Sequence, residues 1–312
     1  MATYDRRSRP KARSPQGMLG AVDIPWTDDF RLDENSFRRL LKRLKGHGFG
    51  RLYVMGTAGE GYAMSDALFR DVVDVFVEEM RGPGLVPQVG AISLSTQQVI
   101  ERVRYAHGKG VRSFQISLPS WGPVSDSEML TFFRVVCGSF PDSEFLHYNL
   151  VRTKRVLTGD DYRKIVDLIP NLTSTKQSTY DMGLIRGWML RAPELQHFFL
   201  QHSFAYGSLF GECSLLCSMA GLFPKLTREY FEAGRTGDAA RAFELQRTFI
   251  DVGESLYGSA KSAHMDGAYD KLLVWLTDPS FPRRLLPPYE TFSDEDATRA
   301  RQAYEARWKA LG

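Results

Sequence analysis

The sequence predicts an α/β protein, a (β/α)8 TIM barrel with a C-terminal helical extension. Short apolar runs that end in Gly, Pro, Ser or Thr occur eight times over about 200 residues, and amphipathic segments separate them. Such alternation is typical of a parallel sheet, and eight units suit a closed barrel. An open doubly wound sheet is less favoured, because no GxGxxG turn follows the first strand. After Pro224 the alternation stops, which predicts the helical extension.

The first half of the chain contains four strand–helix units. In the first unit, Phe37, Leu41 and Leu44 fall at helical spacing, and Asp33 stands at the position of an N-cap. Ser65 is a second capping residue, at the start of the next amphipathic segment. The four pairs are 18–26 with 33–48, 51–61 with a helix from residue 65, 85–93 with 95–110, and 112–120 with 125–140.

The second half completes the barrel and then becomes helical. Its units are 144–150 with 158–169, 171–178 with a helix after Thr179, and strand-like runs at 196–203 and 213–219. Beyond Pro224 the sequence has the pattern of consecutive helices joined at Gly residues. The predicted organisation is a disordered basic tail over 1–16, the barrel over 17–224 and a C-terminal helical region over 225–312.

The composition is that of an ordinary globular protein. Hydrophobic residues make up 43% of the chain, the net charge is +3, and no apolar run approaches the ~20 residues of a membrane span. The first fifteen residues hold five basic residues against one Asp, and such a segment is usually solvated. A nucleic-acid or membrane role for this tail is the alternative, but we expect neither partner.

The cysteines and histidines argue against disulfides and metals. Cys137, Cys213 and Cys217 are an odd number without a CxxC pair, which indicates a reducing compartment and a cytoplasmic location. The six histidines are scattered and form no HExxH motif. The sequence therefore predicts no bound catalytic metal.

The stretch NLTSTKQSTYD, residues 171–181, places a lysine in a strand-like segment. Every second residue before Lys176 is small or apolar, a pattern that suits a buried strand. Burial disfavours the charged ammonium, and a neutral amine attacks a carbonyl group to form a Schiff base. Its protonated imine stabilises the carbanion that forms when a neighbouring bond breaks. The alternative is a structural lysine that pairs with a carboxylate or reaches the barrel mouth.

Further polar residues are expected at the C-terminal ends of the strands, where the active sites of such barrels lie. A phenol at Tyr148 can pass protons to and from a Schiff-base intermediate; otherwise Tyr148 is a rim aromatic. The loop GTAGEG, which contains Thr57, offers backbone N–H groups that suit a carboxylate. The full set on these strand ends is Thr57, Glu60, Ser120, Trp121, Tyr148, Asn149 and Lys176.

Three features together resemble the dihydrodipicolinate synthase/N-acetylneuraminate lyase family of class I, pyruvate-dependent aldolases. They are GTAGE at 56–60, YN at 148–149 and the lysine that follows on the next strand. The family carries a GTTGE or GSTGE loop, a YN pair on strand five and a lysine on strand six. The likeness extends over roughly 17–290, through IPWTDDFRLDE near the N-terminus and SAKSAHMDG near the C-terminus.

The resemblance implies a role for several residues. Lys176 would form the imine with pyruvate or with the 2-oxo end of a larger acid, without any other cofactor. Tyr148 would be the general acid and base, and Thr57 would relay its proton. Backbone N–H groups of Thr57 and Ala58 would hold the substrate carboxylate, and Leu216 would pack beside the pyruvyl group. The family also implies a homo-oligomer, a dimer or a homotetramer.

Four departures from the family bear on the particular reaction. Ala58 stands where the family has a second Thr or Ser, and LPSWGP with Trp121 replaces a segment that contains a relay tyrosine, so lysine biosynthesis is not expected. YNLVRTKR lacks a proline and is one residue shorter before Arg152. Arg152 either binds a distal carboxylate or is a solvated loop charge. GECSLLCSMAG changes the wall around Leu216.

The resemblance leaves three functions open. The first is a Schiff-base lyase or aldolase that joins pyruvate to an aldehyde or separates them, similar to the hydratase-aldolase branch. In that branch Trp121 would form an apolar wall for an aryl group, with Tyr62, Phe204 or Tyr206 as helpers; otherwise it is a core tryptophan. The second is a dehydratase of a 2-keto-3-deoxy sugar acid. The third is a non-catalytic protein that binds 2-oxo acids.

Overall fold

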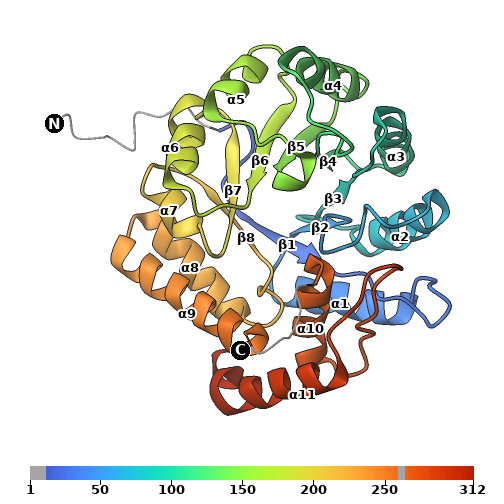
Figure 1. Ribbon diagram of the computed structural model, residues 1–312, viewed down its shortest axis with the longest axis vertical. Coiled ribbons are helices and arrows are strands. Elements are labelled where there is room, and N and C mark those ends of the chain that lie inside the picture. Colours follow the sequence, from blue (N-terminus) through green and yellow to red (C-terminus); the bar gives the residue numbers. More distant parts are fainter. Residues whose placement is uncertain (1–11, 259–263) are drawn as a thin grey trace.

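The computed structural model describes residues 12–258 and 264–312 and confirms the predicted barrel. Eight strands pair in sequence order, and β1 closes the sheet against β8, with every pairing parallel. Figure 1 shows the strands at the centre with the helices around them. The strands are β1 (Met18–Val22), β2 (Arg51–Val54), β3 (Val86–Gly90), β4 (Ser113–Ile116), β5 (Glu144–Asn149), β6 (Leu172–Gln177), β7 (Gln196–Leu200) and β8 (Ser214–Cys217).

Each strand is followed by a helix, and the capping residues explain where several of them begin. The Asp33 carboxylate accepts a hydrogen bond from the backbone N–H of Ser36, and Ser65 does the same for Leu68, so both predicted N-caps are confirmed. The barrel helices are α1 (Glu34–Gly46), α2 (Asp66–Glu79), α3 (Thr96–Gly108), α4 (Asp126–Gly138), α5 (Gly159–Val166), α6 (Met182–Arg191), α7 (Phe204–Ser208) and α8 (Pro224–Thr236). A 3-10 turn, η2 (Val151–Thr153), follows β5.

The extension consists of helices, as the sequence predicts. Pro224 is the first residue of α8, which packs against α7 and β8 and so completes the eighth strand–helix unit. The helices beyond the barrel therefore begin with α9, which lies against α8 and α11 (Figure 1). They are α9 (Ala239–Tyr257), α10 (Asp266–Thr277) and α11 (Asp294–Ala303), followed by η3 (Tyr304–Trp308) and η4 (Lys309–Leu311).

The tail predicted to be disordered over 1–16 needs a correction at its C-terminal end. Residues 1–11 lie outside the described part of the chain, but the residues that follow are held against the barrel. The Arg13 guanidinium donates to the backbone carbonyl of Val166 at 2.8 Å, and Ser14 is fully buried. A basic side chain that finds unpaired backbone carbonyls at a helix end is ordered by them, which composition alone does not reveal.

Two separate apolar clusters stabilise the fold. The larger one lies between the strands and the surrounding helices. The smaller one fills the barrel interior, as expected for inward-pointing side chains that come from several different strands. Its buried members are Leu19, Tyr53, Leu146, Phe198 and Leu216.

A buried ion pair attaches the extension to the barrel. Lys271 on α10 donates to Glu60 Oε1 at 2.5 Å, and both side chains are 0% exposed. The Trp26 indole N–H donates to the same oxygen at 2.9 Å, and the backbone N–H of Leu286 donates to Glu60 Oε2 at 2.6 Å. Lys271 also donates to the carbonyl oxygen of Arg284. These bonds compensate both charges for the loss of water.

We predict that Lys271→Met lowers the free energy of unfolding by about 3–5 kcal/mol, because it leaves the Glu60 carboxylate buried without its counter-charge. Urea unfolding followed by circular dichroism measures this change.

The matched control is Lys164→Met. Lys164 pairs with Asp126 on the surface, where both side chains are more than half exposed, so its loss changes stability little. Equal destabilisation by the two substitutions would contradict the larger contribution to stability that we assign to the buried ion pair.

Candidate active site

Lys176 points into the barrel because its neighbours on β6 point outward. Thr175 Oγ1 lies 2.7 Å from His197 Nδ1, and the Gln177 side chain accepts a hydrogen bond from the Asn149 amide at 3.0 Å. Side chains alternate in direction along a strand, so the residue between these two faces the interior. Only 6% of the Lys176 surface is exposed. The burial predicted from the sequence is therefore confirmed.

Tyr148 is the nearest aromatic neighbour of this amine. It lies opposite Lys176 in the register of β5 and β6, and Lys176 Nζ lies 3.8 Å from the centroid of its ring. The Tyr53 ring centroid lies 5.4 Å from the same nitrogen. In the part of the chain that the structure describes, Lys176 forms no ion pair with a carboxylate. This speaks against a structural lysine held by an acid.

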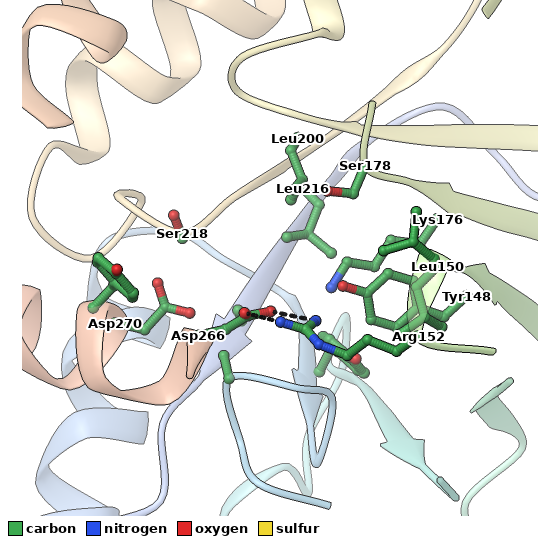
Figure 2. Close-up of a pocket in the computed structure, with 15 residues that line it drawn as sticks. Tyr148, Leu150, Arg152, Lys176, Ser178, Leu200, Leu216, Ser218, Asp266 and Asp270 are labelled. Carbon is green, nitrogen blue, oxygen red and sulfur yellow. Dashed lines mark hydrogen bonds and ion pairs between the residues drawn. The ribbon is translucent and has the colours of Figure 1, made fainter. Parts of the chain in front are cut away.

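A cavity of about 410 Å³ surrounds the amine at the C-terminal end of the barrel (Figure 2). This volume lies in the range of small-molecule sites. Strand residues that line it are Ala21, Tyr53, Tyr148, Lys176, Leu200 and Leu216. The loops after the strands contribute Ala58, Leu150, Val151, Arg152, Ser178 and Ser218. The first turns of α10 contribute Asp266, Tyr269 and Asp270.

The glycine-rich loop passes directly over Tyr53. A Cβ atom at Gly56 would lie 1.7 Å from the Tyr53 hydroxyl oxygen, so only glycine fits this approach. Ala58 lines the cavity of Lys176, whereas Thr57 is 2% exposed and lines an adjoining cavity of about 300 Å³. Among the described residues, no protein group accepts a hydrogen bond from the backbone N–H of Thr57 or Ala58. These two donors are available to a ligand.

Arg152 and Asp266 form an ion pair at the edge of the cavity. The guanidinium donates to the two carboxylate oxygens at 2.7 and 3.3 Å, and Figure 2 shows this double contact. Arg152 also lines the adjoining cavity. The structure thus places this predicted substrate-binding residue at the site, with its charge already matched by Asp266.

Asp270 lies one helical turn after Asp266 and also lines the cavity. Burial raises the pKa of its carboxyl well above the usual value, and the nearby carboxyls of Asp23 and Asp266 raise it further. Lys176 and Ser218 act in the opposite direction and lower this pKa. A carboxyl in such surroundings holds its proton to higher pH than an exposed one.

Several residues that line the cavity escape an inspection of the sequence alone. Tyr53 could have been found from the alternation in RLYV, which turns its side chain to the same interior as Lys176. Asp266 and Asp270 stand four residues apart in MDGAYD, so they share one face of a helix. Nothing local indicates that this face covers the barrel mouth.

Trp121 lies apart from the cavities. Its side chain is 83% exposed, so it is not a core tryptophan, and it lines neither cavity. Ser120, its neighbour, lines the second cavity together with Tyr62. Of the residues predicted to assist Trp121, Phe204 is fully buried and packs edge-on against Tyr230. Phe204 lines neither cavity.

Tyr206, the last predicted helper, packs against Phe243 on α9 and lines neither cavity. The described part of the chain contains no group of three or more His, Cys, Asp and Glu side chains that could hold a metal ion. It also contains no helix with the length and hydropathy needed to span a bilayer.

We predict that Gly56→Ala destabilises the fold by about 1–3 kcal/mol, because the new methyl group forces either the loop or the Tyr53 ring to move. Thermal unfolding of the purified variant tests this. Gly17→Ala is the matched control, since a Cβ atom there meets nothing within 4 Å and should change stability by no more than about 0.5 kcal/mol. Indistinguishable melting of the two variants would contradict the steric argument.

Comparison with known proteins identifies relatives that all come from one family. The model of the dihydrodipicolinate synthetase family matches residues 14–295. The chain is 28% identical over 238 residues to an N-acetylneuraminate lyase of Salmonella paratyphi B, covering 75% of this chain and 79% of that protein. It is 24% identical over 248 residues to a 4-hydroxy-tetrahydrodipicolinate synthase of Methanopyrus kandleri, covering 78% and 81%.

Solved structures share the fold. YagE, a prophage protein of E. coli K12 solved in complex with pyruvate, superposes with a TM-score of 0.84 at 17% identity, over 93% of this chain and 98% of that one. A sialic acid aldolase of Ruminococcus gnavus, solved as a catalytic lysine mutant, gives 0.83 at 18% identity, over 93% and 94%. The chain therefore belongs to the dihydrodipicolinate synthetase family and is a class I lyase, an enzyme that works through a lysine Schiff base.

Proposed function

We propose that this protein joins pyruvate, or a larger 2-oxo acid, to an aldehyde or separates the two, with Lys176 as the residue that forms the imine. The observation that carries the proposal is the buried amine itself. Lys176 Nζ opens into a cavity, lies 3.8 Å from the centre of the Tyr148 ring and pairs with no carboxylate of the described residues. Such an amine is available to attack a carbonyl carbon.

The first half of the reaction makes the imine. Lys176 Nζ attacks the carbonyl carbon of the 2-oxo acid, and the carbonyl oxygen leaves as water. Tyr148 is suited to give and take the protons of this step, because it faces the same cavity from the neighbouring strand. Loss of a proton from the adjacent carbon then gives an enamine, whose carbon attacks the aldehyde.

The substrate carboxylate is assigned to the glycine-rich loop. The backbone N–H groups of Thr57 and Ala58 find no acceptor among the described residues, and Ala58 lines the cavity. The Thr57 hydroxyl is proposed as the proton relay to Tyr148, and Leu216 as the apolar wall beside the pyruvyl group. Two fixed N–H donors suit a carboxylate without a cationic side chain.

The relatives support this assignment from two sides. One structural neighbour was solved with pyruvate bound, and another has a catalytic lysine. Those properties belong to the neighbours, and we propose them for this chain because Lys176, Tyr148 and the loop come together at one cavity.

The acceptor is proposed to be a neutral aldehyde with an apolar or aryl group, similar to those of hydratase-aldolases. An anionic acceptor would have to displace Asp266 from Arg152 before it could bind the guanidinium. Leu94 lines the adjoining cavity with 57% of its surface exposed. An aryl group of the acceptor would cover this apolar side chain.

We predict that pyruvate and borohydride together label wild-type protein on the peptide that contains Lys176, because borohydride reduces the imine to a stable amine. Peptide mass spectrometry locates the label. Lys176→Ala should take up none, and Lys164→Ala, which removes an exposed lysine, should be labelled like wild type. Failure of wild type to form an adduct with pyruvate or a panel of longer 2-oxo acids would refute the mechanism.

We predict that Tyr148→Phe lowers kcat by about 10²–10⁴-fold and changes KM little, because it removes a proton donor and keeps the ring. Steady-state assay of pyruvate release from an aldol substrate measures both constants. Tyr105→Phe is the control, since Tyr105 bonds to Asp74 on the outer helices. Turnover without release of pyruvate would instead indicate a dehydratase.

A further inference from the structure

One polar side of the cavity has no role in the imine formation proposed for Lys176. Figure 2 shows Ser218, Asp266 and Asp270 across the cavity from Lys176 and Tyr148. Asp266 is engaged by Arg152 at two oxygens, whereas Asp270 forms no ion pair with any described residue. Asp270 is partly exposed, and it lines the cavity. Its carboxyl is thus free to meet a ligand.

We propose that Asp270 is the acid and base of the carbon–carbon bond step, acting on the oxygen of the acceptor aldehyde. This inference rests on the proposed function, because the step needs an enamine on Lys176. A bound 2-oxo acid extends from the amine into the cavity, so its reacting carbon and the aldehyde lie between Lys176 and the opposite wall. Asp270 belongs to that wall.

The proton balance of the step is simple. In the bond-forming direction, the enamine carbon attacks the carbonyl carbon of the aldehyde, and the electron pair of the C=O bond moves to oxygen. That oxygen takes the proton of the Asp270 carboxyl, which becomes a carboxylate. In the cleavage direction, the carboxylate removes the hydroxyl proton, the carbon–carbon bond breaks, and its electrons return to the iminium nitrogen.

Ser218 is a polar neighbour of Asp270 on this wall of the cavity. The Gln201 amide donates to Ser218 Oγ at 2.9 Å, which leaves the hydrogen of the Ser218 hydroxyl for another acceptor. Ser218 lowers the pKa of Asp270, so it favours the carboxylate that the proton transfer produces.

The surroundings also set the protonation of this carboxyl. Burial, then Asp23 and Asp266, raise its pKa, and Lys176 and Ser218 lower it. The other titratable groups that interact electrostatically with this carboxyl are Tyr53 on β2, Tyr257 on α9 and Cys217 on β8. Asp23 is itself buried, with a pKa raised to about 7 by its burial. A carboxyl with a raised pKa can donate a proton near neutral pH and is a stronger base once ionised.

The test compares Asp270→Asn with wild type in two assays. Pyruvate with borohydride reports the imine, and pyruvate with benzaldehyde or glyceraldehyde reports the bond-forming step. We expect Asp270→Asn to be labelled at Lys176 like wild type and to lose about 10²–10⁴-fold in kcat for condensation, because the amide cannot transfer the proton. Asp251→Asn, on the exposed face of α9, should match wild type in both assays.

The outcomes separate this inference from the proposed function. Normal condensation by Asp270→Asn, or its loss together with the loss of labelling, overturns the role of Asp270. A wild-type protein that is labelled and condenses neither aldehyde also overturns it, while Lys176 keeps its imine. Absence of label on wild type instead refutes the proposed function itself.

A pH profile distinguishes proton transfer from a merely structural role. Cleavage needs the Asp270 carboxylate, so its rate rises with pH through the pKa of Asp270. Asp23→Asn removes a negative neighbour that raises this pKa, so the rising limb should move to lower pH. An unmoved limb in a folded Asp23→Asn protein would contradict the assignment.

Discussion

The buried ion pair between Glu60 and Lys271 is the interaction on which the geometry of the site depends. It joins the loop after β2 to α10, two segments that lie 211 residues apart in the sequence. Because both charges are removed from water, each requires the other, together with the hydrogen bonds that complete their coordination. The pair thus holds the glycine-rich loop and the acidic face of α10 at the same barrel mouth.

The cavity between these segments has two chemically different sides. The strands supply an amine and a phenol, and α10 supplies carboxyls. A Schiff-base lyase moves protons at two places, around the imine and at the oxygen of the acceptor, so two separate proton donors suit its chemistry. The ion pair of Arg152 with Asp266 neutralises the guanidinium at the rim of the cavity and so lowers the net charge of the site.

The barrel and the strand side of the cavity, with Lys176 and Tyr148, could be predicted from the sequence. Strand patterns, capping residues and strand order placed Lys176 beside Tyr148, because neighbouring parallel strands bring the same ends together. Other features could not be predicted. The sequence does not show that Trp121 is exposed or that backbone carbonyls of another segment hold Arg13. Both facts depend on how segments that are remote in the sequence pack together.

The sequence by itself determined the fold class, the inward direction of Lys176 and its position beside Tyr148, since these follow from the two-residue period of a strand and the order of the units. Only the tertiary structure decided that α10 covers the barrel mouth, that Asp266 forms an ion pair with Arg152, and that Asp270 lines the cavity. The physical reason is that these contacts join segments remote in sequence, and no local periodicity specifies which remote segment will satisfy a buried charge.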